Sequence, residues 1–158
     1  MKIGVLTFHN TMNYGAVLQS YALQKKIKEL GNQCEIINYE CKAIEERERV
    51  KTIKEVKNVK QLAKYILMHP KQKKKRKNFD KYLNSYISIS NEKYDKNNIR
   101  KCVKDYNAIM VGSDQVWNYN LTDNDTTYLL DFADNRVKKA SYAASFGLPS
   151  IEKENIEK

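Results

Sequence analysis

The first part of the chain alternates between short apolar runs and a helical pattern. Residues 3–8 are apolar and β-branched without a charge, which predicts a buried strand, and residues 34–38 (CEIIN) predict a second one. Between them a helix is expected to begin near Gly15 and to end at Gly31, with one face formed by Ala16, Ser20, Leu23, Ile27 and Leu30. Strand, helix and strand in this order predict a βαβ unit with parallel strands.

The remainder of the chain predicts further helices followed by strands. Pro70 is expected to open a new helical segment, and apolar residues recur at helical spacing at 59–67, 79–86 and 99–106. Strands are expected at residues 108–111, 128–132 and 139–145. Together these elements predict an α/β fold in which a parallel sheet carries helices on its faces.

Length and composition are those of one ordinary soluble domain or of part of a larger protein. The chain has 158 residues, and none of its apolar runs approaches the ~20 residues of a membrane span. No signal-peptide cleavage site follows the first strand pattern. The cysteines are odd in number and lack metal-ligand spacing, which favours a reduced cytoplasmic protein; they are Cys34, Cys41 and Cys102.

The positive charge lies in one segment. Residues 51–104 hold 17 Lys or Arg and 4 Asp or Glu, whereas the rest holds 12 basic and 15 acidic residues, so this segment accounts for the formal charge of +10. Its run KQKKKRK adjoins Phe79, Leu83 and Tyr86 at helical spacing, which favours a solvated helix face. Nucleic acid is disfavoured, because no stacking or groove-reading motif accompanies the run. An anionic membrane surface or an anionic lipid-linked substrate is the alternative partner.

Polar and aromatic residues follow three of the predicted strands. HNTMNYG follows the first strand, GSDQVWN follows the strand at 108–111, and Ser145-Phe146-Gly147 ends the last one. In an open parallel sheet, ligands bind beyond the carboxyl ends of the strands. These three loops are therefore expected to converge on one cleft if their strands are neighbours.

Each residue type in these loops also has a structural explanation. Asn13 suits a helix N-cap and Gly15 a tight turn, while His9 suits a partly buried position at a strand end. Asp114 suits the cap of a helix that follows it, and Trp117 suits core packing. The joint occurrence of these residues favours a functional site over the separate explanations.

The motifs of several common sites are absent. Gly15 stands alone rather than in GxGxxG, and GxxxxGK[ST] does not occur, so dinucleotide and phosphate-loop binding are disfavoured. The GxSxG and HExxH motifs are absent as well. Neither a cofactor nor a metal ion is expected.

Four blocks in this order resemble the polysaccharide pyruvyl transferase family: HNTMNYGAVLQSYAL, IMVGSDQVWN, YLLDF and KASYAASFG. The similarity runs from about residue 2 to residue 147, and NYGAxLQxYAL and GSDQxWN are its specific blocks. It implies a Rossmann-like domain, with a parallel sheet and helices on both faces, as the N-terminal half of a GT-B-like enzyme of two domains. That domain would comprise residues 1–150, with a basic helical insertion at about 51–104, and residues 151–158 would begin a truncated continuation.

The resemblance also implies an activity. Members of the family transfer a pyruvyl group from phosphoenolpyruvate to sugar hydroxyls as a ketal, with release of phosphate. The expected protein is then a cytoplasmic enzyme of cell-surface polysaccharide synthesis, with a sugar or a lipid-linked glycan as acceptor. Peripheral contact with the anionic inner face of the membrane would suit such an acceptor. The isolated half is expected to be inactive, because catalysis occurs between the halves.

Candidate roles follow from the chemistry of ketal formation. Asp114 is the candidate base that deprotonates a sugar hydroxyl, because it follows a strand and is flanked by Ser113 and Gln115. His9 is the candidate acid or phosphate donor, since its ordinary pKa lies near working pH. Aromatic rings suit the apolar face of a pyranose and amides suit its hydroxyls. The substrate-binding candidates are Asn13, Tyr14, Gly15, Gln19, Ser113, Gln115, Trp117 and Ser145.

Two alternatives stay open at this point. The chain could be a sugar- or nucleotide-binding module of the same fold without catalysis, which the residues of the second half would decide. It could also be a basic interaction domain, for nucleic acid or a membrane surface, built on residues 51–104. A steep dependence of binding on salt would be the signature of the basic domain.

Overall fold

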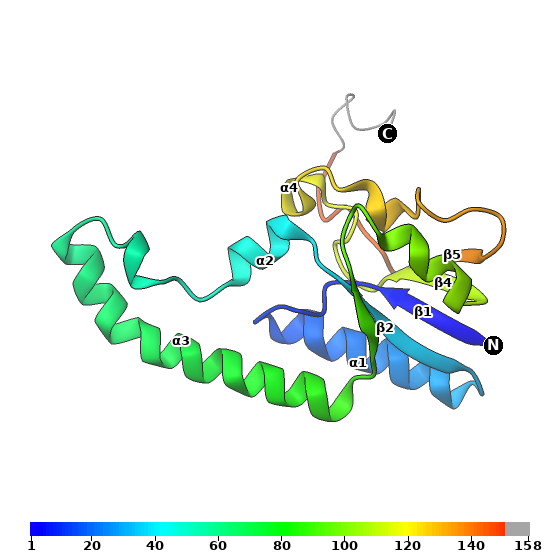
Figure 1. Cartoon of the computed structure of the whole chain (residues 1–158), viewed down its shortest axis with the longest axis horizontal. Helices are drawn as coiled ribbons and strands as arrows, with labels where there is room; N and C mark the ends of the chain where they lie inside the picture. Colours follow the sequence, from blue (N-terminus) through cyan, green and yellow to red (C-terminus); the bar gives the residue numbers. More distant parts are fainter. Residues whose placement is uncertain (151–158) are drawn as a thin grey trace.

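Within residues 1–150, which the computed structural model describes, a five-stranded parallel sheet of order β3-β2-β1-β4-β5 forms the centre of the fold (Figure 1). The strands are β1 (Lys2–Leu6), β2 (Gln33–Tyr39), β3 (Ile89–Tyr94), β4 (Ala108–Gly112) and β5 (Lys138–Tyr142). The α-helices are α1 (Tyr14–Glu29), α2 (Lys42–Glu48), α3 (Val59–Tyr86) and α4 (Tyr119–Thr122). The 3-10 helices are η1 (Ile53–Glu55), η2 (Ile99–Asp105) and η3 (Thr126–Leu129). The predicted α/β fold with a Rossmann-like parallel sheet is confirmed.

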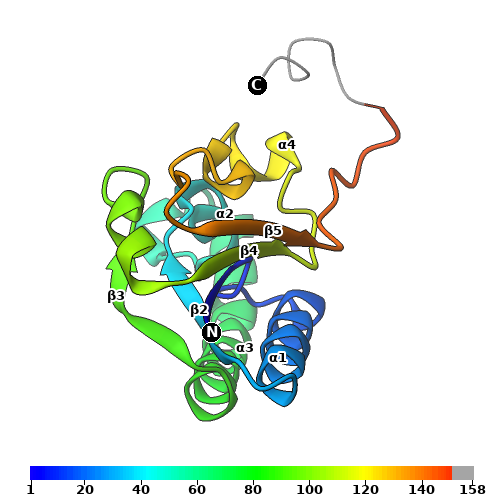
Figure 2. The same cartoon turned by 90° about the vertical axis from the view of Figure 1, so that its right-hand side faces the viewer.

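Both faces of the sheet are covered, because alternate residues of a strand point to opposite sides. On one side the strands share an apolar core with α1 and α3, which includes Val5, Ile36 and Phe79. On the other side they share a core with η2 and η3, which includes Leu6 and Ile37. Figure 2 shows α1 and α3 beneath the sheet and α2 and α4 above it. The expected helices on both faces are therefore present.

Helix α1 begins and ends as the sequence predicts. The side-chain oxygen of Asn13 accepts hydrogen bonds from the backbone N–H groups of Gly15 and Ala16, at 2.9 and 3.4 Å, so Asn13 is the N-cap. At the other end Gly31 has a φ of +80°, a left-handed conformation that glycine adopts readily. The cap fixes where the loop after β1 ends and the helix begins.

The basic segment forms one long helix rather than the two that were predicted. α3 has 28 residues and continues through Pro70, so the expected break at that residue is wrong. An interior proline costs a helix about 3 kcal/mol. Against this cost, Phe79 and Leu83 anchor the C-terminal half of α3 in the core. At its N-terminus the side chain of Asn58 accepts from the N–H of Gln61 at 2.9 Å. Packing and capping thus outweigh the local proline signal.

Three shorter elements also differ from the prediction. β3 was missed, because residues 91–93 of this edge strand are polar and exposed and give no apolar run. The predicted strand at 128–132 is wrong: Asp125 caps η3 at this point, and Leu130 has a left-handed φ of 59°. The helix expected at 99–106 is the 3-10 helix η2.

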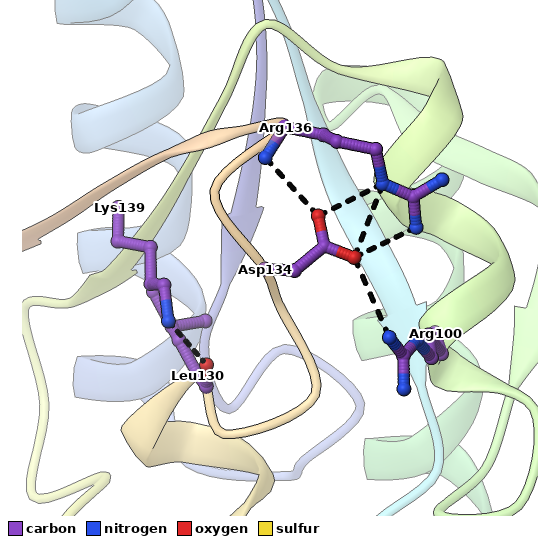
Figure 3. Close-up of polar contacts among 5 residues, drawn as sticks. All are labelled: Arg100, Leu130, Asp134, Arg136 and Lys139. Carbon is purple, nitrogen blue, oxygen red and sulfur yellow. Dashed lines mark hydrogen bonds and ion pairs between the residues drawn. The ribbon is translucent and has the colours of Figure 1, made fainter.

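Ion pairs around Asp134 fix the turn that leads into β5 (Figure 3). The Asp134 carboxylate accepts from the guanidinium of Arg136 at 2.7 Å and pairs with Arg100 of η2 at 3.5 Å. These contacts, chiefly the hydrogen bond with Arg136, lower the pKa of Asp134. β5 then ends at Tyr142, before the predicted end at residue 145.

The basic segment at 51–104 contributes to the sheet as well as to the surface. It contains α3, η2 and also β3, which pairs in parallel with β2 through Ile89 opposite Ile36. The predicted division into a domain at 1–150 with a helical insertion stays a prediction. The continuation predicted at 151–158 lies outside the described residues.

Replacing Pro70 with alanine should stabilise α3. Pro70 is exposed, so the substitution removes about 3 kcal/mol of helix cost without disturbing a packed side chain. We expect slower amide hydrogen exchange in the N-terminal half of α3 and unchanged exchange in β1. Ala63→Gly, at another exposed position of the same helix, should speed that exchange through a cost of about 1 kcal/mol. Unchanged exchange in Pro70→Ala would contradict this expectation.

Candidate functional site

The loops that were predicted to converge leave the sheet at the same edge. β1 pairs with β4 and β4 pairs with β5, all in parallel, and Leu6 lies opposite Val111 near the carboxyl ends. The segments at this edge are residues 7–13, 113–118 and 143–147. Open parallel sheets bind their ligands at such an edge. The three strands are neighbours, so the condition set for convergence of the loops is met.

Backbone hydrogen bonds join the loops after β4 and β5. Gly112 has a φ of +130° and Ser113 a φ of 63°, and the second of these is a costly conformation for a residue other than glycine. The N–H of Ser113 donates to the carbonyl of Tyr142 at 2.6 Å. The N–H of Ser145 donates to the carbonyl of Asp114 at 3.1 Å. Asp114 and Ser145, both predicted site residues, are therefore held side by side.

Asp114 lies half-buried just beyond the end of β4. Its carboxylate accepts a hydrogen bond from the N–H of Gln115 at 2.7 Å. Burial raises the pKa of the Asp114 carboxyl, and the bond from Gln115 partly offsets that rise. Asp114 does not cap a following helix, since α4 begins at Tyr119 and Asn118 is its N-cap. A partly desolvated carboxylate is a stronger base than an exposed one, because burial favours its protonated form.

Trp117 and Gln115 combine structural contacts with partial exposure. The indole Nε1 of Trp117 donates to the carbonyl of Tyr128 at 3.0 Å, and the Trp117 ring packs on Phe146 with ring centroids 5.5 Å apart. The packing explanation for Trp117 is thus supported, although the residue is not fully buried. Gln115 is exposed, and its side-chain oxygen accepts from the amide of Asn118 at 3.2 Å.

The loop after β1 places its predicted residues in separate surroundings. His9 is 3% exposed, its Nδ1 lies 3.3 Å from the carbonyl oxygen of Thr7, and burial lowers its pKa. Tyr14 lines a groove of about 210 Å³ between α1 and α3, where its ring packs on Phe79 with centroids 4.8 Å apart. Within residues 1–150, no hydrogen bond or ring contact joins His9 or Tyr14 to the Asp114 loop.

The three remaining candidates are held by local contacts. The side chain of Asn13 is engaged in capping α1, and Gly15 is exposed beside it. The amide nitrogen of Gln19 donates to the hydroxyls of Thr7 and Ser20, at 2.8 and 3.0 Å. The side-chain oxygen of Gln19 is buried without a hydrogen-bond partner.

A charged cluster that the sequence did not predict supports the loop after β1. The Asn10 amide nitrogen donates to Glu45 of α2 at 3.0 Å, and its oxygen accepts from Arg76 of α3. Glu40, directly after β2, pairs with Lys93 of β3 at 2.8 Å. These five residues are called the loop-support cluster below. They connect the carboxyl ends of β1, β2 and β3 to the helices on both faces.

Two carboxyl groups of the loop-support cluster share a hydrogen bond, and their pKa values move apart. Burial, and then the bond with Glu40, raises the pKa of Glu45. The hydrogen bonds with Lys93 and then with Glu45 lower the pKa of Glu40. Of the two carboxyl groups, Glu45 therefore keeps its proton to the higher pH. The sequence contained part of this signal, because Glu40 follows a predicted strand.

The described part of the chain offers no metal cluster: no group of three or more His, Cys, Asp or Glu residues in 1–150 could hold an ion. In the same residues, the helices are too short or too polar to cross a membrane. The thiols of Cys34, Cys41 and Cys102 are all buried and free.

The fold defines a class, an α/β domain with a five-stranded parallel sheet whose carboxyl edge carries the loops after β1, β4 and β5. A family model for polysaccharide pyruvyl transferases matches residues 13–158. The chain therefore belongs to the polysaccharide pyruvyl transferase family, as its sequence blocks indicated. No curated protein and no solved structure matches it.

Gly112→Ala should disrupt the Asp114 loop. A Cβ at this position would lie 2.2 Å from the carbonyl oxygen of Tyr142, a backbone atom that cannot move away independently. The loss of unfolding free energy should exceed the roughly 1–3 kcal/mol of conformational strain alone. Gly31→Ala is the matched control, because its φ is +80° but no atom lies within 4 Å of its Cβ. Urea unfolding gives the free energy of unfolding of both variants. Equal losses in the two variants would contradict the predicted effect of the clash.

Glu45→Gln should raise stability at alkaline but not at acid pH. Because the folded pKa of Glu45 is raised, its stabilising contribution is full below the ordinary pKa and is lost as pH rises through the folded value. Glutamine mimics the protonated form at every pH. We expect equal melting temperatures at about pH 4, below the ordinary pKa of glutamate, and an increase at about pH 8, where 1 kcal/mol corresponds to roughly 2–4 °C.

The control for this variant is Glu46→Gln on the same helix. Glu46 is exposed and pairs with Arg49, which lowers its pKa, so the control should show no gain at alkaline pH. Melting curves of the three proteins at both pH values decide the matter. A Glu45→Gln protein that melts below the native one at alkaline pH would refute the raised pKa of Glu45.

Proposed function

We propose that this chain takes part in the transfer of a pyruvyl group from phosphoenolpyruvate to a sugar hydroxyl of a cell-surface polysaccharide or its precursor. Membership of the family supports the reaction class. The observation that carries the proposal is the Asp114 loop. There a half-buried carboxylate with a raised pKa stands at the carboxyl edge of the sheet, beside the exposed residues Gln115 and Ser145.

Ketal formation joins one phosphoenolpyruvate to two sugar hydroxyls. Both hydroxyl oxygens form bonds to C2 of phosphoenolpyruvate, and the bond between C2 and the phosphate oxygen breaks. One hydroxyl proton ends on C3, which becomes a methyl group, and the other leaves with the phosphate. The reaction therefore needs a base near the hydroxyls, a proton source for C3 and donors around the phosphate.

Asp114 suits the first of these needs. Its raised pKa makes it a better proton acceptor than an exposed aspartate, and its carboxylate is oriented by the N–H of Gln115. Gln115, Ser113 and Ser145 would hold the hydroxyls of the acceptor beside it. Trp117 would present the unburied part of its ring to the sugar. These groups form an acceptor site rather than a donor site.

His9 suits its predicted catalytic role less well than Asp114 does. It is buried, and burial lowers its pKa, so the ring is neutral near pH 7. A neutral imidazole is a weak acid toward carbon. If His9 acts, its role is that of a hydrogen-bond donor to phosphate after the loop has moved.

We further propose that the domain works as one half of a GT-B-like enzyme, in which a second Rossmann-like half faces the carboxyl edge of the sheet. The exposure of Gln115 and Ser145 at this edge supports the arrangement, because a facing domain would enclose them. Phosphoenolpyruvate would then be held chiefly by the second half. The acceptor would be a sugar or a lipid-linked glycan.

Asp114→Asn should lower turnover of the complete two-domain protein by ~10²–10⁴-fold, the usual contribution of a positioned base. The measurement is phosphate release from phosphoenolpyruvate in the presence of acceptor glycans. With the native enzyme the rate of phosphate release should rise as pH passes through the raised pKa of Asp114. The pH–rate profile of the variant should lack this rise.

The matched control is Asp105→Asn. Asp105 is exposed and precedes β4, at the opposite edge of the sheet, so its loss should leave turnover unchanged. Near-native turnover of Asp114→Asn would remove Asp114 as the base. A native protein that releases no phosphate, yet shows saturable changes of Trp117 fluorescence with glycans, would be a binding module instead.

A further inference from the structure

The N-terminal half of α3 extends away from the body of the domain (Figure 1). Phe79 and Leu83 hold the C-terminal half on the sheet. Along the N-terminal half, the segment around η1 lines one side of the helix, where a cavity of about 530 Å³ is bounded by residues such as Glu55, Tyr65 and Met68. The opposite side of the helix is turned away from both the sheet and this segment.

That opposite side is called the outer face of α3. Because an α-helix turns about 100° per residue, positions that share this side can be assigned along its whole length. Its first part is aliphatic and consists of Val59, Leu62, Ile66 and Leu67. Its second part is basic and consists of Lys73, Lys74, Lys77 and Lys81. Aliphatic and basic side chains thus follow one another along a single side of the helix.

The aliphatic part of the outer face is open to solvent. Val59 is 82% exposed, Ile66 64% and Leu67 66%, and no residue of 1–150 packs over them as the core packs over Phe79. Leu62 is 36% exposed beside them. Grouped aliphatic side chains at the tip of a protruding helix are a typical feature of interaction surfaces.

The charge of α3 restricts what can cover this face. The helix carries nine Lys or Arg and one Asp, and all four lysines of the outer face are exposed. A second copy of the chain would bring two such helices together at the expense of strong repulsion. Nucleic acid would satisfy the lysines but offers no aliphatic surface. An anionic lipid surface offers both, with phosphate headgroups above an acyl interior.

We propose that the outer face of α3 docks this domain on an anionic lipid surface. Val59, Ile66 and Leu67 enter the boundary between headgroups and acyl chains. The lysines from Lys73 to Lys81 lie over the headgroups. The outer face therefore lies along the surface, and its N-terminal, aliphatic part enters more deeply than its basic part. The proposal rests on α3 alone and stands or falls independently of pyruvyl transfer.

Vesicle flotation with the purified chain tests this docking. Vesicles of phosphatidylcholine alone are compared with vesicles of equal parts phosphatidylcholine and phosphatidylglycerol, at low and at high salt. We expect binding to the anionic vesicles that weakens with salt. Ile66→Ser/Leu67→Ser should weaken it at least ~10-fold, from the lost apolar burial. Lys73→Gln/Lys74→Gln/Lys77→Gln should weaken it ~100-fold, at about 1 kcal/mol for each lysine.

Matched controls alter the same chemistry elsewhere. Lys25→Gln/Lys101→Gln/Lys104→Gln removes three exposed lysines outside α3, and Leu30→Ser removes an exposed leucine at the end of α1. Both controls should bind like the native chain, and unchanged melting curves would show that every variant is folded.

Three outcomes would overturn the proposal. The first is an absence of binding to anionic vesicles, or binding that the α3 variants leave unchanged. The second is a concentration-dependent dimer that Ile66→Ser/Leu67→Ser abolishes, which would make the outer face a contact between copies. The third is tighter binding to an oligonucleotide than to vesicles, lost in the lysine variant but retained in the serine variant.

Discussion

The close approach of the β4 and β5 backbones just beyond their last paired residues is the constraint on which the candidate site depends. Gly112 leaves no room for a side chain, because a Cβ there would lie 2.2 Å from the carbonyl oxygen of Tyr142. The chain then turns through Ser113 in a left-handed conformation. This sharp turn brings the half-buried carboxylate of Asp114 beside Ser145. It is held by two backbone hydrogen bonds, one donated by Ser113 to Tyr142 and one that Asp114 accepts from Ser145.

The loop after β1 is fixed in a different way. Within residues 1–150, backbone hydrogen bonds to the neighbouring loops do not hold it. Side chains from helices on both faces of the sheet hold it instead. Glu45 reaches Asn10 from α2 and Arg76 reaches it from α3, while Lys93 fixes the charge of Glu40. One side of the edge is therefore fixed by backbone geometry, and the other depends on charge and, through the raised pKa of Glu45, on pH.

The sequence predicts what short-range patterns determine. β1, β2 and β4 are apolar runs, and α1 has both an N-cap and a glycine at its end. The predicted bounds of these four elements are therefore close to the observed ones. β3 is not predicted from the sequence, because an edge strand with polar residues has no distinctive hydrophobic period. The strand predicted for YLLDF is wrong, because the Asp125 cap starts a 3-10 helix within this apolar run. The parallel-sheet rule predicts that the loops with Asp114 and Ser145 meet if their strands are neighbours, and β4 and β5 are paired. Glu45, Arg76 and Lys93 meet Asn10 and Glu40 only through the tertiary fold.

The charges at the described edge favour the acceptor role that we propose for it. Burial raises the pKa of Asp114 and lowers that of His9, so it favours the uncharged form of both groups. The cations of the loop-support cluster are already engaged, Arg76 with Asp80 and Lys93 with Glu40. The lysines of the outer face of α3 lie on another side of the domain. A trianionic phosphate ester therefore finds little compensation at the Asp114 loop, whereas a neutral sugar finds hydroxyl and amide partners. This asymmetry supports an acceptor half whose donor is held from across the edge.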